Sequence, residues 1–187
     1  MFNQLKTAVS MTLILTLITG FIYPMLVTVL AQTFFPSQAS GSLIIKNKNI
    51  SGSKLIGQNF TSDKYFHSRP SESNYDGTKS GGSNLGPTSK KLIDKIISTA
   101  KGLEKENPNI SPPADLITAS GSGLDPHISI AGAEFQIPRV AIARGISEGA
   151  LHKLVVEHIE KRQFGILGEL RVNVLTLNLA LDNFYSK

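Results

Sequence analysis

Four side chains whose types could support catalysis lie within eight positions of one another: Ser120, Ser122, Asp125 and His127. A Ser-His-Asp triad requires the serine to be hydrogen-bonded to the histidine, and the histidine to the carboxylate. Residues so close in sequence rarely reach that geometry, and Thr118 stands where a G-x-S-x-G elbow needs its first glycine. We therefore expect no catalytic residues and interpret the segment as a rigid turn, in which Gly121 and Gly123 permit positive φ.

The motifs of common nucleotide- and metal-dependent enzymes are absent from this sequence. There is no phosphate-cradling G-x-x-x-x-G-K-[ST], no aspartyl-phosphate run Asp-Lys-Thr-Gly-Thr and no H-E-x-x-H. His152 and His158 are six positions apart, on opposite sides of a helix, so we expect no shared metal ion. The chain has no cysteine, which excludes disulfides, thiolate metal sites and cysteine nucleophiles.

Residues 8–35 form an uncharged, largely apolar stretch of twenty-eight residues. About twenty helical residues cross a hydrocarbon core, so the stretch predicts a transmembrane helix in a lipid bilayer. Gly20, with Thr16 and Thr19, forms a narrow strip that a neighbouring helix could approach. Pro24 removes one backbone hydrogen bond and can kink the helix.

A cleaved signal peptide is the competing interpretation of this stretch, with cleavage after Ala31. Signal peptides have apolar regions of about 7–15 residues, shorter than the stretch present, so we favour a retained single-pass anchor. Lys6 is the only charged side chain before the stretch, which favours a cytoplasmic N-terminus and a body outside the cell (inner or plasma) membrane. A cytoplasmic body that regulates by binding nucleotide is a further alternative.

The rest of the chain has the patterning of one folded domain. All fourteen acidic residues and eighteen of the nineteen basic ones lie from Lys46 onward, with the signs interspersed, so we expect no nucleic-acid partner. We predict a short cytoplasmic N-terminus (1–7), the transmembrane helix (8–35), a connector (36–42) and a soluble domain (43–187). The fold class is α+β: one transmembrane helix followed by a single mixed α/β extracytoplasmic domain.

Hydrophobic periodicity and turn residues locate the elements of this domain. We expect a β-hairpin over 43–56, an extended piece over 59–69 and a brief buried strand at Ile117. A helix capped by Thr88 or Ser89 is predicted to run to about Glu106. Two more are predicted, one from Ser129 or nearby through Ala143 with a bend or restart at Pro138, and one from Glu148 to Arg162. Residues 172–182 fit a strand or a helix, and Asn173, a good N-cap, favours the helix. Residues 70–87, rich in Ser, Asn and Gly, form a long loop for which we expect a functional role.

Four blocks of the sequence carry a resemblance to a known family. They read Tyr-Phe-His-Ser-Arg-Pro-Ser (65–71), Ser-Gly-Gly-Ser-Asn-Leu-Gly-Pro (80–87), Ala-Ser-Gly-Ser-Gly-Leu-Asp-Pro-His-Ile-Ser (119–129), and Arg-Val-Asn-Val-Leu (171–175) followed by Leu-Asn-Leu-Ala-Leu-Asp (177–182). In this order, with Gly20, Tyr23 and Pro24 in the anchor, they closely resemble the C subunit of the bacterial and archaeal Kdp-type potassium-transporting ATPase.

The resemblance implies an accessory subunit that is not itself an enzyme. In that family a separate P-type subunit hydrolyses ATP and a channel-like subunit selects potassium, and these two are the implied partners. The family subunit is described as a catalytic chaperone that raises the ATP affinity of the P-type subunit. We therefore expect no tightly bound cofactor, and ATP only together with the pump subunit. The open alternative is an exported, signal-cleaved hydrolase or binding protein that uses the turn 120–127.

Two loops are our candidates for contact with the partners or with nucleotide. The first contains Ser80, Gly81, Gly82, Ser83 and Asn84, and the second contains Gly121, Gly123, Asp125 and His127. The Ser-Gly-Gly run is similar to the signature loops of other transporters, which bind a γ-phosphate through backbone N–H groups. Our hypothesis is that both loops dock on the partner subunits.

Overall fold

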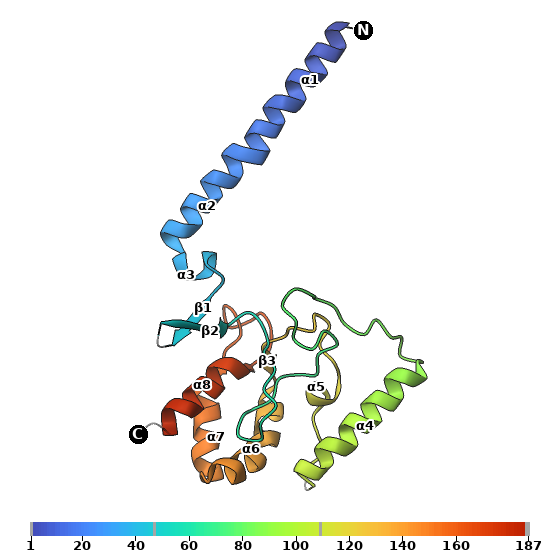
Figure 1. Ribbon diagram of the computed structural model, residues 1–187, viewed down its shortest axis with the longest axis vertical. Coiled ribbons are helices and arrows are strands. Elements are labelled where there is room, and N and C mark those ends of the chain that lie inside the picture. Colours follow the sequence, from blue (N-terminus) through green and yellow to red (C-terminus); the bar gives the residue numbers. More distant parts are fainter. Residues whose placement is uncertain (1, 47, 109, 186–187) are drawn as a thin grey trace. The chain divides into compact units, whose positions relative to one another are not determined.

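The computed structural model describes residues 2–46, 48–108 and 110–185. The chain divides into two compact units, Met1–Ser53 and Lys54–Lys187. This division groups residues 43–53 with the N-terminal helix, whereas the sequence analysis grouped them with the soluble domain. The mixed α/β content of the body agrees with the expected fold class (Figure 1).

A long apolar helix makes up most of the first unit. It consists of α1 (Phe2–Leu17), a π-helical turn (Ile18–Ile22) and α2 (Tyr23–Phe34). By length and composition the helix is able to cross a membrane. The π turn lies directly before Pro24, and in it the Tyr23 N–H donates to the Ile18 carbonyl, five residues back. A π turn replaces i→i−4 hydrogen bonds by i→i−5 bonds, here next to a proline that has no N–H to donate.

The remainder of this unit is a short helix and a hairpin. Helix α3 (Pro36–Ala39) begins on a proline, whose fixed φ suits the first helical position. Strands β1 (Leu43–Lys46) and β2 (Asn49–Ser53) pair antiparallel, with a bulge between Ile44 and Ile45. The predicted hairpin is therefore confirmed, although its second strand ends at Ser53 and does not reach residue 56.

The second unit packs its helices against a small sheet. The helices are α4 (Lys90–Glu106), α5 (Ala114–Ile117), α6 (Ile130–Arg144), α7 (Glu148–Glu157) and α8 (Val174–Tyr185). Strands β3 (His127–Ile128), β5 (Arg171–Asn173) and β4 (Ile159–Glu160) form an antiparallel sheet in that order. Helices α6, α7 and α8 pack together, while α4 lies beside α5 (Figure 1). The core is apolar and includes Phe66, Val140, Val155, Val172, Leu177 and Leu181, each fully buried.

Several predicted elements are confirmed. Helix α4 begins after Ser89, and α6 begins after Ser129, whose Oγ accepts the Gly132 N–H at 2.9 Å. Pro138 lies inside α6 without a restart. The ambiguous tail is helical, because the Asn173 side chain accepts the Thr176 N–H at 3.1 Å as an N-cap.

Two predictions about regular structure were wrong. Ile117 belongs to the short helix α5 and not to a strand. Helix α7 ends at Glu157, and Ile159 and Glu160 form β4, because they pair with Val172 and Arg171 of β5. The predicted helix therefore ends five residues before Arg162. In both places contacts with distant segments outweigh local propensity.

Residues 59–69 form no strand, although an extended piece was expected there. Buried side-chain amides satisfy their backbone instead. Asn178 accepts the Phe66 N–H and donates to the Phe66 carbonyl, both at 2.9 Å. Gln136 accepts the His67 N–H at 2.7 Å and donates to the His67 carbonyl at 3.2 Å. Each amide thus acts as a one-residue strand partner, which keeps a buried irregular segment hydrogen-bonded.

Candidate functional site

The two loops chosen from the sequence lie against each other. The Gly81 N–H and the Ser80 hydroxyl both donate to the Ser122 carbonyl, at 2.8 and 3.1 Å. At the other end of the contact, the Ser120 N–H donates to the Pro70 carbonyl at 2.9 Å. Loop 70–87 therefore uses its polar groups to hold turn 120–127. In particular, the Gly81 N–H is engaged within the chain and is not directed at a phosphate.

One of the candidate glycines, Gly123, is required by this loop contact, and a second, Gly82, is closely packed in it. Gly123 has φ +71°, and a Cβ there would lie 2.7 Å from Ser73 Oγ and 2.8 Å from the Gly81 carbonyl oxygen. A Cβ on Gly82 would lie 3.0 Å from the Gly121 carbonyl oxygen. The Gly123 carbonyl also accepts the Ser71 hydroxyl at 2.6 Å. These glycines serve the internal packing of the fold.

The other residues of the two loops are more exposed. A Cβ on Gly121 would meet nothing within 4 Å, and neither would one on Gly81. Asn84 is exposed with φ +52°, a conformation that asparagine tolerates. The Ser83 hydroxyl accepts the Leu85 N–H at 3.5 Å. The outer rim of the loop pair is thus the part that a partner could reach.

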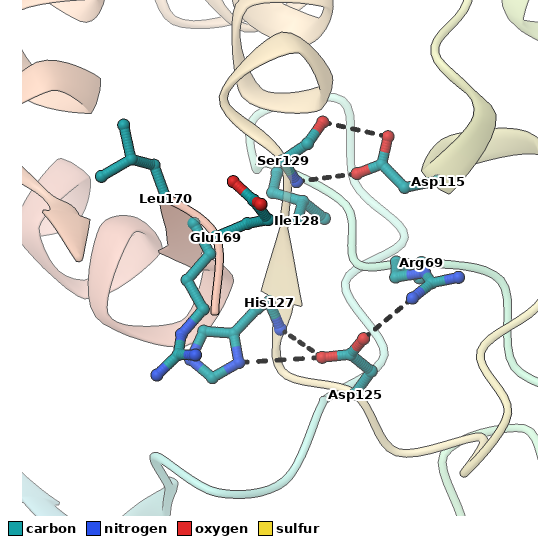
Figure 2. A pocket seen from close by; sticks show the side chains of 9 residues that line it. Arg69, Asp115, Asp125, His127, Ile128, Ser129, Glu169 and Leu170 are labelled. Carbon is teal, nitrogen blue, oxygen red and sulfur yellow. Dashed lines mark hydrogen bonds and ion pairs between the residues drawn. The ribbon is translucent and has the colours of Figure 1, made fainter. Parts of the chain in front are cut away.

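Asp125 joins turn 120–127 to Arg69, the residue directly before loop 70–87. Its carboxylate accepts from Arg69 Nη1 at 3.0 Å and from the His127 N–H at 3.0 Å (Figure 2). His127 Nδ1 lies 3.7 Å from the same carboxylate, and His127 Nε2 lies 3.3 Å from Glu160 Oε2. Glu160 in turn pairs with Arg171 Nε at 3.1 Å. A chain of polar contacts therefore runs from Arg69 through Asp125, His127 and Glu160 to Arg171 of β5.

The pKa of Asp125 shows the balance of forces on this carboxyl. Burial by itself raises its pKa, but hydrogen bonds from the His127 ring and backbone and from Arg69 outweigh burial. The pKa of Asp125 consequently lies below its ordinary value. At neutral pH the group is a carboxylate that fixes the turn and holds Arg69.

The serines of the turn are not aligned with the histidine. Ser120 Oγ and Ser122 Oγ lie 3.1 Å from each other and accept the N–H groups of Gly123 and Leu124, both at 3.1 Å. In the described part of the chain, the His127 ring faces Asp125, Glu160 and Asn173, and it makes no hydrogen bond to either serine. A triad needs the serine–histidine hydrogen bond first, so this arrangement gives the hydrolase interpretation no support.

An open cavity of about 360 Å³ lies beside this turn (Figure 2). Its lining is Arg69, Asp115, Asp125, His127, Ile128, Ser129, Glu169, Leu170 and Arg171. The lining mixes both signs, and Asp115 is itself engaged by the Ser129 N–H and hydroxyl at 2.7 and 3.1 Å. Such a lining suits a polar group but selects neither an anion nor a cation.

Comparison with known proteins identifies the family of this chain. The model of the KdpC family, described as K+-transporting ATPase, c chain, matches residues 5–183. The chain belongs to the KdpC family. A relative from Rhodopseudomonas palustris (strain BisB18) is 50% identical over 97% of this chain and 98% of its own length. One from Bradyrhizobium diazoefficiens is 48% identical over all of both chains, and one from Koribacter versatilis is 51% identical over 97% of this chain and 95% of its own. All three are named potassium-transporting ATPase KdpC subunit.

Membership of the KdpC family confirms the resemblance stated from the four sequence blocks. The chain is thus a subunit of a potassium-transporting ATPase, a complex that implies partner subunits. Among the residues chosen for the anchor, Gly20 lies in the π turn and Pro24 follows it, while Tyr23 is 63% exposed. The apolar helix that holds them is consistent with membrane association.

The sequence patterns did not reveal the role of Arg139, which joins α6 to α4 and to the backbone of residues 63–65. Arg139 has a side chain only 8% exposed, and its Nε lies 2.8 Å from Glu106 Oε2 on α4. Burial lowers the pKa of Arg139, whereas the neighbouring carboxylates of Glu106 and Asp63 act to raise it. A basic residue one position after Pro138 in an apolar helix was the available signal. It was not used, because charge alone does not reveal a buried partner.

Proposed function

We propose that this chain is a non-catalytic, membrane-anchored accessory subunit that assembles and stabilises the potassium pump. Its full-length KdpC match is the single observation that carries the proposal. The engaged serines and histidine of the turn support the non-catalytic part, because no nucleophile is aligned with a base there. On this proposal the partners are a channel-like subunit that selects potassium and a P-type subunit that hydrolyses ATP.

The proposed topology is a retained helix in the cell membrane, with the N-terminus in the cytoplasm and the body outside. The uninterrupted apolar helix Phe2–Phe34 supports an anchor, since it is longer than a signal peptide requires. The single charged side chain before the uncharged stretch, Lys6, supports a cytoplasmic N-terminus.

Any effect on ATP affinity is then indirect. A body outside the membrane does not meet cytoplasmic ATP, so the subunit would raise the affinity of the P-type subunit by favouring one of its conformations. The hydrogen bond from the Gly81 N–H to the Ser122 carbonyl supports an indirect effect, because the central N–H of the Ser-Gly-Gly run is already bonded within the fold. The proposal includes no tightly bound cofactor.

Single-cysteine labelling tests the topology. The chain has no cysteine, so Lys79→Cys and Gln4→Cys each introduce a unique thiol. The Lys79 side chain is 77% exposed on loop 70–87, and Gln4 is exposed near the N-terminus. In intact cells a membrane-impermeant maleimide should label Lys79→Cys and spare Gln4→Cys until the membrane is permeabilised.

The opposite labelling pattern would place the body in the cytoplasm and reopen direct nucleotide binding. Recovery of the mature chain from the aqueous fraction, starting at Gln32, would instead favour the exported alternative. Intact mass measurement of the same samples separates these two outcomes.

A further inference from the structure

An exposed apolar loop connects the last two strands of the body. Every residue of 161–170, here called the apolar loop, is exposed. Phe164 is 92% exposed, Ile166 75%, Leu167 55% and Leu170 45%. Large apolar side chains gathered on a surface mark sites of interaction, whereas scattered ones do not.

The apolar loop is ordered by its own backbone. The N–H groups of Gln163 and Leu167 donate to each other's carbonyl oxygens, both at 2.9 Å. The Gly165 N–H donates to the Arg162 carbonyl at 3.1 Å, which closes a tight turn. Below the turn, β4 and β5 pair, and Val172 of β5 is fully buried in the core. The apolar side chains are therefore presented from a fixed base.

Phe164 adopts a backbone conformation that is unfavourable for a bulky residue. Its φ is +53°, in the left-handed region that glycine or asparagine occupies most easily. The neighbouring Gly165 and Gly168 also have positive φ, at +78° and +81°. Phe164 combines an unfavourable backbone conformation with an exposed ring, so it adds no stability to the isolated body. Such strain is a feature of binding sites.

We infer that the apolar loop docks into an apolar pocket on a partner subunit of the pump, with the Phe164 ring as the central anchor. Buried aromatic anchors carry a large share of the affinity at protein interfaces. The inference rests on the proposed function, which supplies a folded partner subunit. It also moves the expected docking surface away from Gly82 and Gly123, which face other atoms of the body closely, at 3.0 and 2.7 Å from their Cβ positions.

The apolar loop carries Lys161, Arg162 and Glu169, a net charge of +1 that is too small to hold it on anionic headgroups by charge alone. Arg162 is engaged by Glu169 at 2.6 Å, so Lys161 is the only cation of the loop outside this ion pair. The Glu169 side chain is 83% exposed beside the apolar tip, where an anionic lipid surface would repel it. The loop also contains no Trp or Tyr, the residues most typical of lipid interfaces. A fixed tip with an ion pair at its edge suits an apolar pocket with a polar rim.

Photocrosslinking in the assembled pump tests the contact. Phe164 is replaced by the photoreactive analogue benzoylphenylalanine, and Ile142, which is 84% exposed on α6, is replaced in the same way as the control. We expect the probe at 164 to give a product with the mass of this chain plus a pump subunit, and the probe at 142 to give none. A product with lipid, or none from position 164, overturns the inference.

Dissociation of the purified complex tests the energetic contribution. Phe164→Asn removes the ring while keeping a residue that tolerates positive φ, so the body is expected to stay folded. Release from the tagged pump subunit should be about tenfold faster or more. Ile166→Ser should also speed release, whereas Ile142→Ser should not. A cross-link with unchanged release overturns docking too, because the loop would then only lie near the subunit.

The controls separate this inference from the proposed function. If the unmodified chain does not co-purify with pump subunits, the proposed function fails and the apolar loop fails with it. If the unmodified chain co-purifies and Phe164→Asn is released no faster than Ile142→Ser, the proposed function stands and the docking assignment is wrong. Thermal unfolding of each variant confirms that only the surface has changed.

Discussion

At the scale of single residues, the same residue type serves different purposes at neighbouring positions. Gly123 has positive φ and would direct a Cβ onto Ser73 Oγ and the Gly81 carbonyl. Two residues earlier, Gly121 has open space at the corresponding position. The sequence presents both glycines in one Ser-Gly-Ser-Gly run and gives no sign of the difference. Only the approach of loop 70–87 distinguishes them.

The glycine pair makes a matched test of this difference. Gly123→Ala should lower the free energy of unfolding by about 2–4 kcal/mol, since backbone strain and a contact with fixed atoms combine. Gly121→Ala, in the same turn, should change it by no more than about 0.5 kcal/mol. Thermal or chemical unfolding of the detergent-solubilised chain measures both. Equal effects of the two substitutions would contradict the loop contact.

At the scale of elements, buried amides take the place of a strand in the body. Asn178 on α8 is 1% exposed and pairs with both backbone groups of Phe66, and Gln136 on α6 does the same for His67. The irregular segment that contains Phe66 and His67 is thereby held against α8 and α6. Removing the Asn178 amide would leave a buried N–H and a buried C=O of Phe66 without hydrogen-bond partners.

Asn178→Leu should therefore lower the free energy of unfolding by about 2–4 kcal/mol, although leucine suits a helix better than asparagine does. Asn183→Leu is the control, because Asn183 is an exposed residue of the same helix and its substitution should be nearly neutral. Circular dichroism during urea unfolding follows both variants. A neutral Asn178→Leu would show that water replaces the amide.

At the scale of the whole molecule, burial couples the stability of the body to pH. Burial lowers the pKa of His67, and the nearby Arg139 lowers it further, while the Ser62 carbonyl and neighbouring carboxylates act in the opposite direction. The folded chain therefore binds fewer protons at this ring than the unfolded chain does. Its contribution to stability is present above the unfolded pKa and is lost as the pH falls through the folded pKa.

We expect the free energy of unfolding to fall as the pH is lowered from about 7 to about 5. In His67→Gln this slope should be shallower, because the titrating ring is gone. Unfolding at several pH values measures the slope, and the NMR titration of the His67 ring measures its pKa directly. A ring that titrates at or above the ordinary histidine value would contradict the burial argument.

The elements that follow from local sequence patterns could be predicted without the tertiary structure. An uncharged stretch of twenty-eight residues dictates a helix, because an apolar environment leaves the backbone no other partner. Periodicity located α4 and α6, and the four blocks identified the KdpC family. Contacts that depend on distant partners come from the tertiary structure: β4 forms because Ile159 pairs with Val172, and Gly123 has no room for a Cβ because Ser73 and Gly81 approach it. Such pairings follow from packing energies summed over the whole body, which no local pattern contains.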